Sequence, residues 1–83
     1  MADQAQINYG DWDSVSPSGR LLRPREVVRR TGLSRSLIYQ MIAVGRFPPF
    51  IKIGARASAM PESWLDAFVK RAAERALAQG EVL

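Results

Sequence analysis

The sequence predicts a mainly α-helical domain with a small β-hairpin wing, the architecture called a winged helix-turn-helix, preceded by a flexible N-terminal tail. Two amphipathic stretches that meet at Thr31-Gly32-Leu33 predict the helix-turn-helix, and a longer amphipathic stretch near the C-terminus predicts a third helix. The wing is predicted because Pro48 and Pro49 interrupt the helical pattern and β-branched residues follow them. A core in a chain of 83 residues is small, so each of these elements has to contribute to it.

The first helix is expected to begin at Pro24, where the missing N–H of proline costs nothing. Glu26 then lies in the first turn, beside the positive end of the helix dipole. Leu22 and Val27 have the spacing of a hydrophobic staple. Gly32 is expected to end this short helix in a left-handed conformation.

The second helix is expected to be capped by Ser34 and to run to about Val44. Four residues at helical spacing should form its apolar face: Leu37, Ile38, Met41 and Ile42. The other side then carries Arg35, Ser36, Tyr39, Gln40 and Ala43. Two short helices with a glycine turn and a polar outer face are typical of a helix-turn-helix, but many helical hairpins share that pattern and bind nothing.

A wing is expected directly after the second helix. Residues 50–53 predict a strand, Gly54-Ala55-Arg56 a turn, and residues 57–60 a short return strand. This hairpin places Arg56 at or near its tip. A cation there can lie beside a phosphate backbone or in the electronegative minor groove of DNA, whereas the alternative is a structural hairpin with a solvated arginine.

The third helix is expected to begin at Pro61, with Glu62 in its first turn, and to end at Gly80. Trp64 and Phe68 on its apolar side are expected to cover the core rather than to stack on bases. The domain should therefore span residues 20–80, with residues 81–83 as a C-terminal tail.

Residues 1–19 are expected to form a flexible acidic tail, because they hold three aspartates, no basic residue and a Ser-Pro-Ser-Gly run at the end. Tyr9, Trp12 and Val15 stand three residues apart in this tail. They can form a partner-binding patch, or fold back and compete with nucleic acid for the basic centre. The alternative is a disordered leader with incidental aromatic residues.

Charge is concentrated in the middle of the chain. The formal net charge is +4, yet residues 20–56 carry nine basic residues against Glu26 alone. Arginine dominates this stretch, and its planar fork suits phosphates and guanine edges. Polyanion binding is the leading hypothesis, and a solvated basic surface is the alternative.

Several function classes are excluded by what the sequence lacks. It has no cysteine and no histidine, so thiol nucleophiles, zinc–thiolate sites and imidazole chemistry are excluded, and no enzyme activity, metal or cofactor is expected. There is no apolar run of membrane-spanning length and no signal-peptide pattern, so a soluble, cytoplasmic protein is expected.

The run LLRPREVVRRTGLSRSLIYQMIAVGRFPPFIKIGARA, with the following ESWLDAFVKR, resembles the AlpA/excisionase family. These are small phage- and mobile-element-encoded proteins with a MerR-like winged helix. The resemblance covers about residues 20–72, and TGLSRSLIYQMI, GRFPPFIKIG and WLDAF are its most specific parts. Met60 departs from the pattern, because family members usually carry an aromatic residue there. The return strand is also less polar than usual, and the acidic tail lies outside the pattern.

The resemblance implies sequence-specific binding of double-stranded DNA in a bacterial cell, in association with the nucleoid. It implies one of two roles: a transcriptional regulator of excision genes, or an excisionase (recombination directionality factor) that bends DNA and directs a cognate integrase. Because one domain contacts few base pairs, we expect repeated sites bound by a homodimer or a side-by-side array. No small-molecule effector and no membrane partner is expected. The alternative is a small adapter or inhibitor that uses the acidic tail.

The candidate DNA-binding residues follow from placing the second helix in the major groove. Arg35 is expected to contact guanine and Gln40 to contact adenine or a phosphate. The full recognition-helix set is Ser34, Arg35, Ser36, Tyr39 and Gln40. Arg56 is assigned to the minor groove, and the candidate phosphate contacts are Arg23, Arg25, Arg46 and Lys52. Arg29 and Arg30 are further phosphate candidates, although at least one arginine of this group is expected to face away or to pair with Glu26.

Overall fold

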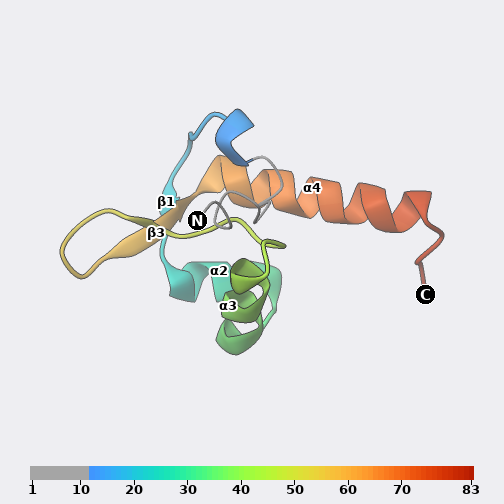
Figure 1. The fold of residues 1–83 in the computed structure, drawn as a ribbon, viewed down its shortest axis with the longest axis horizontal. Coiled ribbons are helices and arrows are strands. Elements are labelled where there is room, and N and C mark those ends of the chain that lie inside the picture. The colour runs from blue at the N-terminus through green and yellow to red at the C-terminus, as the bar shows by residue number, and fades with distance from the viewer. Residues whose placement is uncertain (1–11) are drawn as a thin grey trace.

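A computed structural model describes residues 12–83 and confirms the predicted fold class, with three α-helices beside a small antiparallel sheet (Figure 1). The order along the chain is a 3-10 helix η1 (Trp12–Ser14), β1 (Leu21–Leu22), α2 (Pro24–Thr31), α3 (Arg35–Ala43), β2 (Ile51–Lys52), β3 (Ser58–Pro61) and α4 (Glu62–Ala78). No helix among the described residues is both long and apolar enough to span a membrane.

The helix-turn-helix forms where the sequence predicts it. Pro24 is the first residue of α2, and Gly32 ends that helix with φ of 76°. The hydroxyl of Thr31 donates to the Val27 carbonyl and accepts from the Leu33 N–H, which tightens the turn. The Ser34 hydroxyl oxygen then caps α3 by accepting from the Leu37 N–H at 3.1 Å.

The wing is present, and its return strand belongs to a larger sheet than expected. The strand order is β1-β3-β2, with Ile51 opposite Ala59 in the wing and Leu22 opposite Met60 on the other side of β3. The two-residue strand β1 is not predicted by the sequence. Pro61 also differs from the prediction, because it is the last residue of β3 and the N-cap of α4 rather than the first helical residue.

The core lies between the sheet and the three helices. Its fully or almost fully buried members are Leu22, Val27, Ile38, Phe47, Met60 and Leu65. Phe68 of α4 packs on Phe47 with ring centroids 4.4 Å apart, and Trp64 also lies against this cluster, as expected. Met60 is fully buried, so its flexible side chain fills a core position. Leu37 corrects the predicted apolar face of α3: it is 40% exposed, because it lies at the edge of the face that Ile38 centres.

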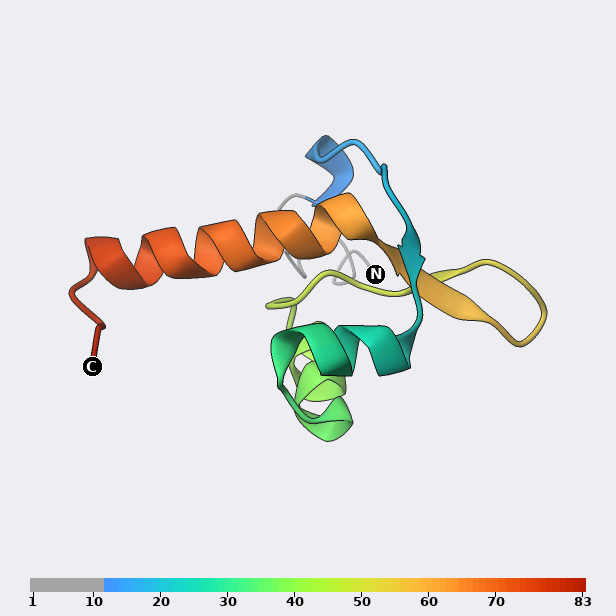
Figure 2. The ribbon, with the colours of Figure 1, turned by 180° about the vertical axis from the view of Figure 1, so that it is seen from behind.

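Residues 12–19, here called the N-terminal strap, pack along the start of α4. The Trp64 indole N–H donates to the Val15 carbonyl at 2.9 Å. The Ser63 hydroxyl donates to the Ser16 carbonyl and accepts from the Ser18 N–H, both at 2.9 Å. These contacts hold the strap on α4, across that helix from α2 and α3 in both ribbon views (Figure 2).

The strap and Arg20, the residue that follows it, together cap the N-terminus of α4. Pro61 at the N-cap has no capping side chain, and the first N–H groups of a helix have no partner within it. The Ser63 N–H donates to the Ser18 carbonyl at 3.1 Å, and the Glu62 N–H donates to the Arg20 carbonyl at 2.8 Å. For residues 12–19 the structure therefore differs from the expected flexible tail. Residues 1–11, and with them Tyr9 of the expected aromatic patch, lie outside the described residues.

Candidate nucleic-acid interface

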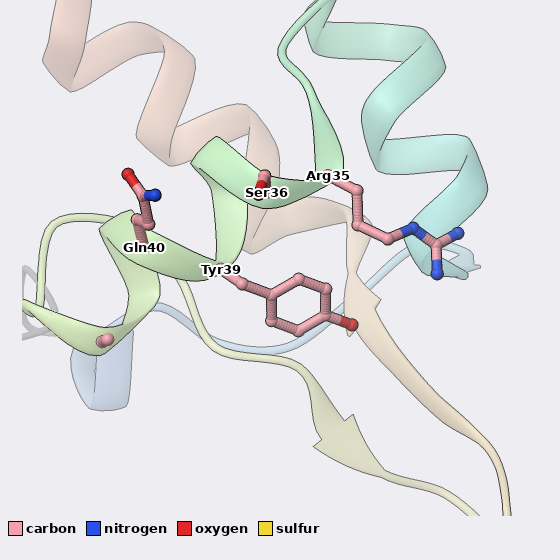
Figure 3. Close-up of a pocket in the computed structure, with 5 residues that line it drawn as sticks. Arg35, Ser36, Tyr39 and Gln40 are labelled. Carbon is pink, nitrogen blue, oxygen red and sulfur yellow. The ribbon is translucent and has the colours of Figure 1, made fainter.

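The outer face of α3 carries the polar side chains predicted for a recognition helix. Arg35, Ser36, Tyr39 and Gln40 line a shallow hollow on this face together with Ala43 (Figure 3). The Arg35 and Tyr39 side chains point toward the side of α2 and the wing, whereas Gln40 points away from them. All of these side chains are exposed. The Ser34 hydroxyl oxygen, in contrast, already accepts the capping hydrogen bond, although its own O–H remains a donor.

A second hollow lies between α2 with its N-cap Arg23, the outer face of α3 and the wing. We call it the arginine hollow, because five arginines from these three parts line it: Arg23, Arg25, Arg29, Arg35 and Arg56. Pro24, Glu26, Tyr39 and Ser58 complete its lining. Because Arg35 and Tyr39 border both hollows, the outer face of α3 and the arginine hollow form one continuous surface.

The electrostatics of the arginine hollow favour an anionic ligand. Glu26 is the single carboxylate among its lining residues, and Arg20 pairs with it at 2.8 Å. The hydrogen bond from Arg20 holds the pKa of Glu26 below its ordinary value, so this carboxylate is charged at neutral pH. Since Arg20 balances Glu26, the charge of the five lining guanidinium groups remains available to phosphates.

Two contacts connect the wing to the rest of this surface. The Tyr39 ring on α3 packs on Phe50, just before β2, with centroids 5.7 Å apart and an interplanar angle of 40°. The Arg23 guanidinium donates from Nε to the carbonyl oxygen of Ser58 on β3 at 3.1 Å. The N-cap of α2 and the outer face of α3 are thus each joined to the wing by one side-chain contact.

Arg30 points away from the arginine hollow. Its guanidinium pairs with Glu62 at 2.8 Å and lies 3.8 Å from a carboxylate oxygen of Asp66, both on α4. The hydrogen bond from Arg30 lowers the pKa of Glu62, and the Arg20 N–H adds to that effect. This confirms that one arginine of the basic group faces away, whereas Glu26 pairs with Arg20, a residue outside the predicted phosphate set.

The structure brings together most of the predicted site residues. Five of them line the arginine hollow: Arg23, Arg25, Arg35, Tyr39 and Arg56. Ser36 and Gln40 share the outer face of α3 with Arg35. Arg46 and Lys52 are exposed but line neither hollow, and Ser34 lines neither as well.

Sequence reasoning missed the part played by Ser58, whose backbone carbonyl holds Arg23. No side-chain pattern marks a backbone acceptor, so the sequence carried no signal for it. Arg29 was only a secondary candidate, although its spacing of four residues from Arg25 places both on one face of a helix. Among residues 12–83 there is no cluster of acidic side chains that could hold a metal ion.

The comparisons with known proteins fit this geometry. The family model described as prophage CP4-57 regulatory protein (AlpA) matches residues 20–73. The chain belongs to the AlpA family. AlpA-family proteins are DNA-binding regulators, and the matched residues include α2, α3, the wing and the first part of α4.

One phage protein provides a further comparison. Over 50 residues the chain is 42% identical to a protein of Enterobacteria phage P4 described as uncharacterized protein ORF88. The match covers 60% of this chain and 57% of the phage protein, so the chain spans just over half the length of that relative. No solved structure matches the chain.

Proposed function

We propose that this AlpA-family chain binds a specific sequence in double-stranded DNA, with α3 in the major groove and the wing over the adjacent minor groove. The observation that carries the proposal is the convergence of five arginines from α2, α3 and the wing on one hollow beside the outer face of α3. Guanidinium forks fit phosphates and guanine edges, and the major groove admits an α-helix.

Each predicted side chain then has a role. Arg35 reads guanine, and Gln40 reads adenine or holds a phosphate, while Ser34, Ser36 and Tyr39 donate to bases or phosphates. Arg56 enters the minor groove from the wing. The phosphate contacts are Arg23, Arg25, Arg29, Arg46 and Lys52.

In the cell, we propose that the protein is an excisionase of a phage or integrative element, a transcriptional regulator of its excision genes, or both. One domain of this size reaches few base pairs, so it acts at repeated sites as a homodimer or a side-by-side array. A cognate integrase is its protein partner in excision, and its location is the bacterial cytoplasm at the nucleoid. The description of the matching family as a prophage regulatory protein supports this assignment.

The adapter alternative has less support. It relies on the acidic N-terminal segment, and the described part of that segment packs on α4, across from α2 and α3 (Figure 2). The test uses a chain that lacks residues 1–11 and retains the strap, because deleting residues 1–19 would also remove the carbonyl of Ser18 that caps α4. An adapter shifts no duplex in either form. The proposal predicts a sequence-specific shift in both.

The decisive experiment measures base discrimination. Duplexes are selected from a random-sequence pool with the full chain, and affinities are then measured for the selected and a scrambled duplex. Arg35→Ala is expected to reduce the preference for the selected duplex about 10- to 100-fold, because a bidentate pair with a base is worth about 1–3 kcal/mol. Arg35→Lys keeps the charge but loses the fork, so it is expected to keep the affinity for scrambled DNA and lose the preference.

Arg75→Ala is the matched control. Arg75 is exposed on α4, outside both hollows, so its loss is expected to leave the preference unchanged. An equal loss of affinity for both duplexes in Arg35→Ala would make Arg35 a phosphate contact. Failure to select any sequence would refute specific binding. An excision reaction with the integrase of the same element separates the two cellular roles: stimulation supports an excisionase, and no stimulation favours the transcriptional role.

A further inference from the structure

Strand β1 covers only part of one edge of the return strand β3, and a side chain provides a further hydrogen bond to that edge. Strand β1 pairs with β3 only at Met60 and Pro61, so it ends before it reaches Ser58. After β1 the chain turns into α2, whose first residue is Pro24 and has no N–H to give. The Arg23 guanidinium supplies the donor instead, from Nε to the Ser58 carbonyl at 3.1 Å.

Among the described residues, the outer part of the wing makes few other hydrogen bonds. Beyond the two residue pairs between β2 and β3, the N–H groups of Ile53 and Gly54 both donate to the Ala57 carbonyl, at 2.9 and 3.2 Å. Residues 53–56 are exposed. At the base of the wing, β3 is held by its pairing with β1 and by the Arg23 bond to Ser58, and the residue before β2 is held by the Tyr39–Phe50 ring contact.

We propose that Arg23 is a positioning residue that fixes the wing relative to α3 and so decides where Arg56 meets DNA. The part of this inference that concerns DNA rests on the proposed function. A guanidinium has five N–H donors, and the bond to Ser58 uses one of them. The other four lie on the same rigid plane, in a side chain that lines the arginine hollow. A phosphate bound by these Nη groups contacts the same guanidinium that is hydrogen-bonded to Ser58 of the wing. Phosphate binding and wing position are therefore coupled.

The first test uses the free protein and needs no DNA. Arg23→Met is expected to speed amide hydrogen exchange at Ile53 and Gly54 about tenfold. Arg25→Met is the matched control, because Arg25 lines the same hollow and carries the same charge but makes no hydrogen bond to the wing among those found in the described residues. Its wing amides are expected to exchange as in the unchanged chain.

The fold of each variant is checked at a helix-turn-helix amide. The Gly32 N–H donates within the end of α2, and its exchange is expected to stay constant in all variants. Arg23→Lys provides a second variant that keeps the charge but lacks the Nε donor, and its wing amides are also expected to exchange faster. Unchanged exchange of the wing amides in Arg23→Met and Arg23→Lys would overturn the proposal.

The second test compares footprints on the selected duplex. Both methionine variants remove one cation, so each is expected to lower the salt dependence of binding by about one phosphate contact. Only Arg23→Met is expected to lose several-fold protection in the minor groove under the wing while it keeps the major-groove protection by α3. Equal footprints for Arg23→Met and Arg25→Met would overturn the coupling to DNA. If no variant binds DNA, the proposed function fails, but the exchange result still decides whether Arg23 positions the wing.

Discussion

Replacing Trp12 with alanine is expected to destabilise the whole domain, although Trp12 lies outside the residues 20–73 that match the family. The Trp12 side chain is only 4% exposed. The guanidinium of Arg71 lies 4.9 Å from the centroid of its ring, an arrangement favourable for a cation–π contact. The indole thus fixes the start of the strap on α4.

The expected loss combines two opposing effects. Removing a buried tryptophan side chain costs about 3–5 kcal/mol. The Nε1–H of Trp12, however, is buried with no hydrogen-bond partner among the described residues, and such an orphaned donor costs about 1–3 kcal/mol that alanine does not incur. We therefore expect Trp12→Ala to lower the free energy of unfolding by about 2 kcal/mol. Trp12→Phe keeps the ring and removes the orphaned donor, so it should stay within about 1 kcal/mol of the unchanged chain.

Urea and thermal unfolding, followed by far-ultraviolet circular dichroism, measure both variants. In a domain of this size, 2 kcal/mol corresponds to a fall in Tm of about 10 °C. A loss below about 0.5 kcal/mol in Trp12→Ala would refute the packing of the strap, because exposed positions behave in that way. A loss in Trp12→Phe equal to that in Trp12→Ala would show that the indole N–H has a partner.

Two further predictions concern the contacts of α4. Gly19→Ala is expected to cost at least about 1 kcal/mol more than Gly32→Ala in unfolding experiments: both residues have positive φ, but only at Gly19 would a Cβ meet the Glu62 Cβ, at 2.9 Å. Equal losses of stability in the two variants would show that the Glu62 side chain does not lie against Gly19. The pKa of Glu62 is lowered in the folded state, so its contribution to stability is present above the ordinary glutamate pKa and is lost as the pH falls through the folded value. The difference in Tm between the unchanged chain and Glu62→Gln should therefore shrink from pH 7 to pH 3, and a constant difference would contradict the ion pair with Arg30.

The sequence predicted those parts of the fold that depend on residues close together along the chain. The ends of α2 and α3 were predictable from the sequence, because they are set by Pro24, Gly32 and Ser34 acting on backbone groups within four residues. Strand β1 was not predictable from the sequence, because Leu22 pairs with Met60, a residue far along the chain. The strap was missed for the same reason: its polar sequence resembles a linker until α4 provides its partners.

The candidate site was predictable in composition but only partly in geometry. Helical spacing places Arg35 and Tyr39 on the polar side of α3, and turn chemistry places Arg56 near the wing tip. Periodicity does not say which of the three arginines in α2 will meet a carboxylate on α4, so the pairing of Arg30 with Glu62 needed the structure. The bond from Arg23 to a backbone carbonyl likewise depends on where β1 ends.

The salt dependence of DNA affinity tests the central claim most directly. If the arginine hollow and its flanking cations neutralise about five or six phosphates, the logarithm of the association constant should fall against the logarithm of the salt concentration with a slope of about −5. The measurement uses the full chain, the selected duplex and salt from about 50 to 200 mM. A slope near −5 is the predicted result, and a slope near zero would contradict DNA binding through this surface.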